Sequence, residues 1–160
     1  MLRQVNVKFV MVVAALVAGL YMSRGGTLVS RPAPDFSLPG VYGGRFNLDT
    51  YRGRPVLLVF WTSSCSICQH ELPMLSRLEP TFRSKGVTIL AIHLGGEEAA
   101  ADYLGANSIS LTALVDDNGA VGRKYRVGGV PKLVLVGADG KIKRSKSGWT
   151  DESVLRHWID

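Results

Sequence analysis

Residues 56–73 read Val-Leu-Leu-Val-Phe-Trp-Thr-Ser-Ser-Cys-Ser-Ile-Cys-Gln-His-Glu-Leu-Pro. The first six residues form an apolar run that is typical of a buried strand at the centre of a sheet. A short polar turn follows, and apolar residues then recur at helical spacing as Leu72, Leu75, Leu78 and Phe82. The chain has two cysteines, Cys65 and Cys68, and both lie where this helix is expected to begin. The stretch therefore predicts a strand, a turn and a helix that hold a cysteine pair at the surface.

The start of a helix favours a reactive thiolate. Unsatisfied backbone N–H groups and the positive end of the helix dipole stabilise the negative charge there. The pKa of a free thiol, about 8.5, falls to roughly 3.5–7.5 at such sites. We therefore expect Cys65 to be the nucleophile and Cys68, one turn further on, to resolve the mixed disulfide. Glu71 follows Cys68 by one turn and is expected to exchange a proton with it, the alternative being an exposed glutamate with no such role.

Other uses of a cysteine pair are less favoured. A structural disulfide that closes so short a loop constrains little of the unfolded chain and adds little stability. A zinc site needs further ligands, but His70, His93 and His157 are scattered along the sequence. We expect His70 to face solvent and His93 to be a core or loop residue. No cofactor is expected beyond the redox-active disulfide itself.

The remaining segments predict one α/β domain without repeats. Further strands are expected over 45–48, 87–94, 111–115, 132–136 and 141–146, and helices over 65–85, 97–106, 120–125 and 150–159. Thr150 is the expected N-cap of the last helix. The lysine-rich strand 141–146 is interpreted as a protected sheet edge, with an anionic docking patch as the alternative.

The composition suits a globular protein, with 160 residues, 46% hydrophobic and 20% charged. The formal charge of +6 is concentrated at the N-terminus, since Arg3, Lys8, Arg24 and Arg31 all precede the first acidic residue, Asp35. Without those four, 15 basic residues face 13 acidic ones. The charge therefore gives no reason to expect a nucleic-acid partner.

The N-terminus predicts export. Residues 9–22 are uninterruptedly apolar and follow Arg3 and Lys8. As a helix they span about 21 Å, less than a hydrocarbon core of about 30 Å unless flanking residues extend the run. We expect a signal-anchor over 1–22, a linker over 23–39 and the folded domain over 40–160. The alternative is a signal peptide that is cleaved to release a secreted domain. Both place the domain outside the cytoplasm.

The motif Phe60-Trp61-x-x-x-Cys65-x-x-Cys68-x-x-Glu71-x-Pro73, with Val130-Pro131 further along, resembles the membrane-anchored TlpA/ResA branch of the thioredoxin superfamily. The resemblance covers about residues 32–159. It implies a thioredoxin-like α/β fold, with a central mixed β-sheet flanked by helices behind a hydrophobic leader helix. It also implies a cis Pro131 against the cysteine pair, and a substrate-binding surface formed by Trp61, Val130 and Pro131.

The same resemblance implies a function. The expected activity is that of an extracytoplasmic thiol–disulfide oxidoreductase at the bacterial inner membrane, with its domain in the periplasm. We expect it to act as a reductant, for example in the maturation of cytochrome c or another metalloenzyme. The expected partners are client proteins with cysteine pairs and a membrane thiol–disulfide electron carrier, and the protein itself is expected to be a monomer.

Three features depart from the family pattern. Ser64 stands where tryptophan is common, Ser66-Ile67 contains no proline, and Lys132 stands where threonine is common. The dipeptide leaves the direction of electron flow open, and the other two leave the client open. A Ser-x-Cys-x-x-Cys stretch is also similar to the accessory thioredoxin of methylamine dehydrogenase maturation.

Two functions of other classes remain as alternatives. A thiol peroxidase is suggested by Thr62, three residues before Cys65, although Leu58 occupies the place where that motif usually has proline. A copper-binding chaperone is the second, although such related folds usually space the cysteines one residue wider and add a histidine.

Overall fold

The computed structural model of the protein describes residues 11–13 and 28–160. The predicted leader over 1–22 and the first part of the predicted linker, 23–27, lie outside the described residues apart from 11–13. Within the described ranges, no helix has both the length and the apolar character needed to span a membrane.

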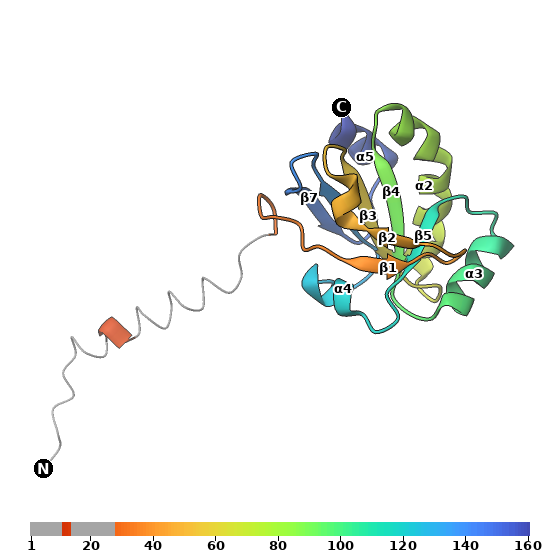
Figure 1. Ribbon diagram of the computed structural model, residues 1–160, viewed down its shortest axis with the longest axis horizontal. Coiled ribbons are helices and arrows are strands. Elements are labelled where there is room, and N and C mark those ends of the chain that lie inside the picture. Colours follow the sequence, from red (N-terminus) through yellow and green to blue (C-terminus); the bar gives the residue numbers. More distant parts are fainter. Residues whose placement is uncertain (1–10, 14–27) are drawn as a thin grey trace, which may run out of the picture.

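A five-stranded mixed sheet forms the centre of the domain (Figure 1). Its strand order is β5-β4-β3-β6-β7; β3 is parallel to β4 and antiparallel to β6. In chain order the elements are β1 (Ser37–Pro39), β2 (Arg45–Asn47), η1 (Leu48–Tyr51), β3 (Val56–Trp61), α2 (Ser66–Ser84), β4 (Thr88–His93), α3 (Glu97–Ala106), β5 (Thr112–Val115), α4 (Ala120–Lys124), β6 (Lys132–Val136), β7 (Ile142–Ser147) and α5 (Glu152–Ile159). The predicted mixed sheet flanked by helices is confirmed.

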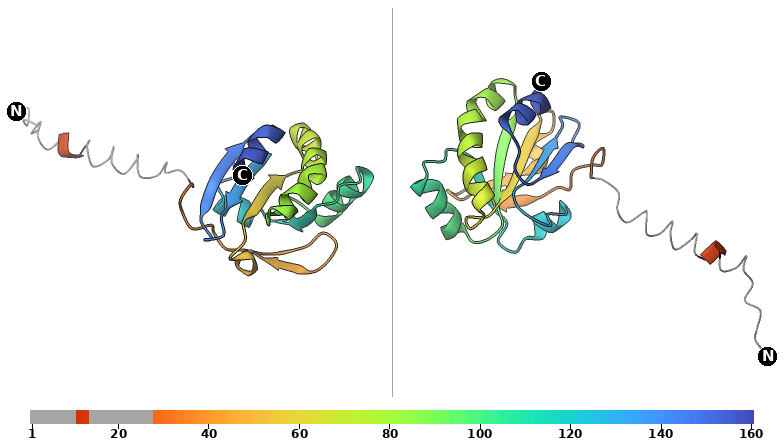
Figure 2. Two further views of the ribbon diagram at one scale, coloured as in Figure 1. Left: turned by 90° about the horizontal axis from the view of Figure 1, so that it is seen from above. Right: turned by 180° about the vertical axis from the view of Figure 1, so that it is seen from behind.

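The six residues of β3 are all buried because both faces of the strand are covered. Successive side chains of a strand point to opposite faces. Leu57, Val59 and Trp61 pack in one apolar cluster with buried residues of α2, α3 and α5. Their neighbours on the strand pack in a second cluster, which includes Phe36, Leu38, Leu48, Val121 and Tyr125. In Figure 2, α2 and α5 lie on one side of the sheet and the β1–β2 hairpin on the other.

The folded domain begins before residue 40, so the predicted linker over 23–39 is wrong for residues 28–39. β1 pairs with β2, and the side chains of Phe36, just before β1, and of Leu38, within it, are buried. The backbone N–H of Ser30 donates to the carbonyl of Ile142 over 2.7 Å. The prolines of this segment disfavour a helix, but an extended chain along the domain tolerates them.

Two helix starts differ from the prediction. α2 begins at Ser66, with Cys65 as its N-cap, and continues through Pro73 and Pro80. α5 begins at Glu152, with Asp151 as its N-cap. The predicted N-cap, Thr150, is fully buried and its backbone has another partner, because the chain bends inward there before the helix starts.

Candidate active site

The turn between β3 and α2 holds the two cysteines. They form a disulfide with 5.2 Å between their Cα atoms. Cys68 is buried, whereas Cys65 is partly exposed, so a protein sulfur can approach only Cys65 directly. The N–H of Cys68 donates to Sγ of Cys65 over 3.1 Å. This donor from the first turn of the helix is placed to stabilise a thiolate at Cys65 once the pair is reduced.

A loop from the other half of the chain reaches the disulfide. The Val130–Pro131 peptide bond is cis, and the carbonyl oxygen of Val130 lies 3.6 Å from Sγ of Cys65. Pro131 is buried and Val130 is partly exposed. Two segments 65 residues apart therefore meet at the reactive sulfur. The geometry brings together Cys65, Cys68, Val130 and Pro131, the arrangement that the family resemblance implied.

Glu71 is fully buried, so the alternative of an exposed glutamate is wrong. Its Oε1 accepts the backbone N–H of Thr150 over 2.9 Å, and Oε2 has no hydrogen-bond partner among the described residues. Burial raises the pKa of this carboxyl to about 7, an effect that the hydrogen bonds from Thr150 and the charge of Lys146 partly oppose. A carboxyl that titrates near neutral pH one helical turn from Cys68 is suited to proton exchange.

Trp61 lies beneath the site, and its predicted place on the substrate-binding surface is corrected. It is the last residue of β3, its exposure is 0%, and its indole Nε1 has no partner among the described residues. The ring packs against His93, with 4.6 Å between centroids, and against Tyr103, with 5.5 Å. The side chain therefore supports the turn from below, because the sheet face on which it lies is covered by helices.

Lys132 points into the protein. Its side chain is buried, and Nζ donates to the carbonyl oxygens of Tyr125 and Arg126 over 3.0 and 2.9 Å. Burial, and the nearby charge of Arg126, lower the pKa of the ammonium group. Lys132 thus holds the loop that leads to Val130, and the family departure at this position lies inside the protein.

An apolar hollow adjoins the cysteines. It is lined by Ile67, which lies between them, and by His70 and Trp149. Ile67 is 43% exposed and Trp149 is 41% exposed, so the hollow presents apolar surface to solvent beside the cysteines. The predicted exposure of His70 is confirmed. Sequence reasoning missed Trp149, because nothing in its neighbourhood marks it before the fold brings the segment between β7 and α5 to α2.

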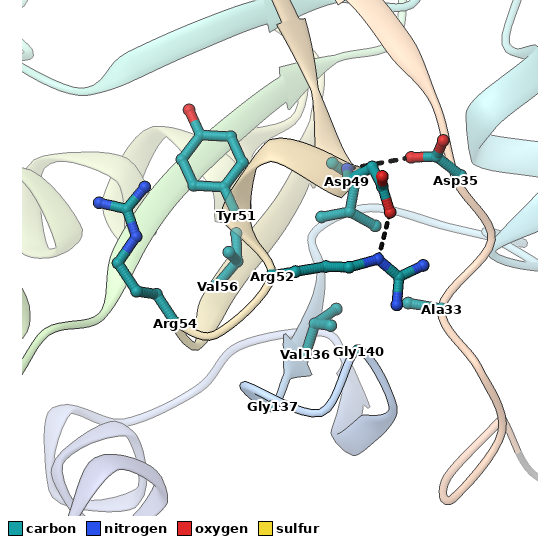
Figure 3. A pocket seen from close by; sticks show the side chains of 11 residues that line it. Ala33, Asp35, Asp49, Tyr51, Arg52, Arg54, Val56, Val136, Gly137 and Gly140 are labelled. Atoms are coloured by element: carbon teal, nitrogen blue, oxygen red, sulfur yellow. Dashed lines mark hydrogen bonds and ion pairs between the residues drawn. The ribbon is translucent and has the colours of Figure 1, made fainter.

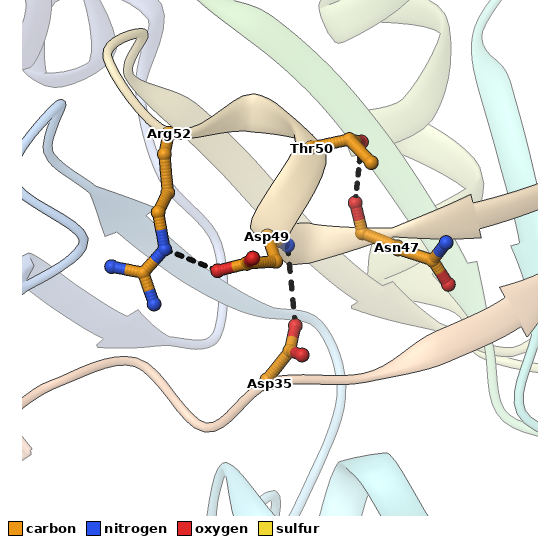
Figure 4. Close-up of polar contacts among 5 residues, drawn as sticks. All are labelled: Asp35, Asn47, Asp49, Thr50 and Arg52. Carbon is orange, nitrogen blue, oxygen red and sulfur yellow. Dashed lines mark hydrogen bonds and ion pairs between the residues drawn. The ribbon is translucent and has the colours of Figure 1, made fainter.

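A second pocket lies at the opposite end of β3, near Val56 (Figure 3). Its charged groups all have partners within the pocket. Asp35 accepts the N–H of Asp49, which pairs with Arg52 (Figure 4), and Arg54 lies over the ring of Tyr51. The pocket therefore shows no free reactive group. Within residues 11–13 and 28–160, no group of three or more histidine, cysteine or acidic side chains could hold a metal ion.

Comparisons with known proteins agree with this geometry. The family model described as "AhpC/TSA family" matches residues 29–145. The thiol-disulfide oxidoreductase ResA of Geobacillus kaustophilus is 28% identical over 144 residues, which cover 89% of this chain and 83% of the relative. The crystal structure of a putative thiol:disulfide interchange protein DsbE from Chlorobium tepidum superposes with a TM-score of 0.76 at 27% identity, over 82% of this chain and 95% of that one. The crystal structure of StoA from Bacillus subtilis superposes with a TM-score of 0.71 at 23% identity, over 80% of this chain and 98% of that one, and shares the fold. The expected thioredoxin-like fold is thereby confirmed.

Proposed function

This chain belongs to the AhpC/TSA family and is a thiol–disulfide oxidoreductase, and we propose that it works outside the cytoplasm as a reductant of client proteins. One observation carries the proposal. The partly exposed Sγ of Cys65 lies at the start of α2 and 3.6 Å from the carbonyl oxygen of Val130. An extended client segment that pairs with this backbone brings its own disulfide to Cys65.

The reaction begins with the reduced pair. The thiolate of Cys65 attacks one sulfur of the client disulfide, so that a new S–S bond forms and the other client sulfur leaves as a thiolate. The thiolate of Cys68 then attacks Sγ of Cys65, which restores the Cys65–Cys68 disulfide and releases the second client sulfur. Two electrons pass from the pair to the client, which gains two thiols.

Glu71 serves the second step. Cys68 must lose its proton before it attacks, and the buried carboxylate one turn away is the group we assign to accept it. Because its pKa is raised to about 7, Glu71 exists in both protonation states near neutral pH. It can therefore take the proton during client reduction and return it when the disulfide is reduced again.

The remaining parts of the proposal concern the cellular setting. The apolar run 9–22 behind Arg3 and Lys8 supports a single membrane anchor, or a cleaved signal, with the domain outside the cytoplasm. Repeated turnover as a reductant requires electrons, for which we assign a membrane thiol–disulfide carrier. The client class is proteins with a cysteine pair, such as those that acquire haem or another metal centre, and the protein acts as a monomer.

The decisive experiment traps the client. In Cys68→Ser the mixed disulfide cannot be resolved, so client proteins should remain covalently bound to Cys65 and be identified by mass spectrometry after reduction. Cys65→Ser is the matched control and should trap nothing and catalyse no exchange. Exchange at the wild-type rate in Cys65→Ser would end this proposal. Trapped clients that are oxidised in cells lacking the protein support the reductant direction, and clients that are reduced in those cells would contradict it.

A peroxidase would behave differently. Rapid peroxide consumption that survives Cys68→Ser would favour the thiol peroxidase alternative, because a peroxidatic cysteine needs no second cysteine in this chain for its first step. Stoichiometric copper binding to the reduced protein would likewise favour the chaperone alternative.

A further inference from the structure

The turn between β3 and the cysteines is held by side chains from two other elements. The backbone N–H of Ser63 donates to Nε2 of His93, at the end of β4, over 3.2 Å. The carbonyl oxygen of Ser63 accepts Nε2 of Gln69, in the first turns of α2, over 2.9 Å. The backbone N–H and the backbone carbonyl of Ser63, two positions before Cys65, are therefore both held by side chains.

The imidazole has little freedom to move. His93 is 2% exposed, and its ring packs edge-on against Trp61. Gly95 lies close to the ring, where a Cβ atom would be 3.0 Å from Cε1. Trp61 is in turn packed against Tyr103, whose hydroxyl donates to the carbonyl oxygen of Gln69 over 3.3 Å. The ring, the turn and the first part of α2 form one connected assembly.

We propose that His93 is a positioning residue for disulfide exchange, in which its neutral imidazole holds the active-site turn and thereby fixes where Cys65 lies. The functional consequence rests on the oxidoreductase activity proposed above. A backbone N–H can only donate, so Nε2 of His93 must be the acceptor and the ring proton must lie on Nδ1. Protonation would place an N–H against the N–H of Ser63 and break the contact.

The surroundings favour the neutral ring. Burial lowers the pKa of His93, and the nearby backbone of Gly95 and Gly96 opposes this effect. Titratable groups on the neighbouring elements are Tyr103 of α3, reached through Trp61, and Asp116 after β5. The backbone N–H of Asp116 donates to the carbonyl of His93, but its carboxylate accepts the N–H groups of Val121 and Gly122. The acidic side chain nearest to Gly96, Asp117, is exposed.

The test compares three variants of the full-length protein. His93→Phe removes the acceptor, His93→Gln supplies an uncharged acceptor in its place, and His157→Phe, on an exposed residue of α5, is the control. Hydrogen exchange at the Ser63 amide should become about fivefold faster or more in His93→Phe, the effect of losing one hydrogen bond. His93→Gln should restore most of the protection, and the control should retain it all.

The second readout is the reactivity of Cys65 toward an alkylating reagent in the reduced protein, followed against pH. His93→Phe should change this profile. In the wild type, protonation of His93 should reduce the reactivity of Cys65 at acid pH by more than protonation of the thiol alone does. This additional loss should be absent in His93→Gln, whose amide does not titrate.

Nitrogen NMR shifts of His93 should show a protonated Nδ1 and an unprotonated Nε2. A protonated Nε2 at neutral pH, or a Cys65 profile and Ser63 protection unchanged in His93→Phe, would overturn the proposal. If His93→Phe does not fold, the His93→Gln profile and the NMR shifts decide. None of these measurements uses a client. The role of His93 can therefore fail its test while the proposed function stands, and the proposed function can fail while the role of His93 stands.

Discussion

The backbone N–H of Thr150 donates to the buried carboxyl of Glu71 over 2.9 Å, although 79 residues separate them in the chain. This hydrogen bond joins the segment just before α5 to α2, the helix that follows Cys65 and contains Cys68. Only one oxygen of Glu71 is engaged, and the other faces no hydrogen-bond partner in the described part of the chain. The carboxyl is therefore held in place while remaining easy to protonate, which leads to the first two predictions.

Stability of the oxidised protein should depend on the charge of Glu71. Its pKa is about 7 in the folded chain against 4.5 for the unperturbed group. Because the pKa is higher in the folded chain, the contribution of this group to the free energy of unfolding is fully present below pH 4.5. It is lost as the pH rises through 7, and the total loss is roughly 3 kcal/mol. Urea unfolding at pH 5 and pH 8 should show this loss in the wild type relative to Glu71→Gln, which stays neutral. Equal pH dependence in the two proteins would contradict the burial of a titrating carboxyl.

The same substitution should alter the resolving step. In Glu71→Gln no carboxylate is available to accept the proton of Cys68, so closure of a preformed mixed disulfide at Cys65 should slow near neutral pH. The rate should recover at alkaline pH, where the thiol ionises without help. Stopped-flow measurement with a small aromatic disulfide follows this step. A pH profile identical to the wild type would leave Glu71 with a purely structural role.

Lys146, in β7, should influence the pKa of Glu71. Its positive charge lowers the pKa of the carboxyl, so Lys146→Gln should raise that pKa above the wild-type value. Carbon NMR titration of the Glu71 side chain measures the change directly. Lys141→Gln removes the same charge from an exposed position directly before β7 and should leave the titration unchanged. Equal effects of the two substitutions would show a general charge effect instead of a local one.

The segment before residue 40 should contribute to stability. Phe36 is 5% exposed and packs edge-on against Tyr125, with 6.4 Å between ring centroids. Phe36→Ala should therefore cost about 3 kcal/mol, the usual result of emptying a buried aromatic site. Ser37→Ala, at the next and exposed position, should change stability by less than about 0.5 kcal/mol. Denaturant unfolding compares them, and a small effect of Phe36→Ala would restore the view of this segment as a linker.

Removal of the Lys132 ammonium should weaken the loop that carries Val130. Lys132→Met keeps the length of the side chain but leaves the carbonyls of Tyr125 and Arg126 without this donor. A cost of about 1–3 kcal/mol is expected from buried acceptors that lose their partner. Lys141→Met, on the exposed edge, is the control and should be close to neutral in urea unfolding. A stabilising effect of Lys132→Met would mean that burial of the charge outweighs its hydrogen bonds.

Much of the fold followed from local patterns. The buried run 56–61, the helix over 97–106 and the strand over 132–136 were predicted with the bounds that the structure shows. Such patterns report the period of the backbone and the burial of each face, which neighbouring residues already encode. The starts of α2 and α5 were each missed by one residue because a capping residue and a first helical residue look alike in sequence.

Errors arose where the environment of a residue depends on distant segments. Phe36 and Leu38 lie in a proline-rich stretch that resembles a linker, and only pairing with β2 and packing on Tyr125 bury them. Trp61 belongs to the motif that suggested a client surface, yet the helices above that face of the sheet cover it. The inward position of Lys132, whose ammonium group donates to two carbonyl oxygens, was likewise not readable from the sequence.

The cysteine pair and its place between a buried strand and a helix are consequences of residues 56–73 alone, because strand burial, helix initiation and thiolate stabilisation at a helix start are local effects. The completion of the site is not local. The contacts of Cys65 with Val130, of Glu71 with Thr150 and of Ser63 with His93 join segments 65, 79 and 30 residues apart. No spacing in the sequence specifies these contacts, since they result from the order and register of the strands in the sheet and from the packing of α2 and α5 against it.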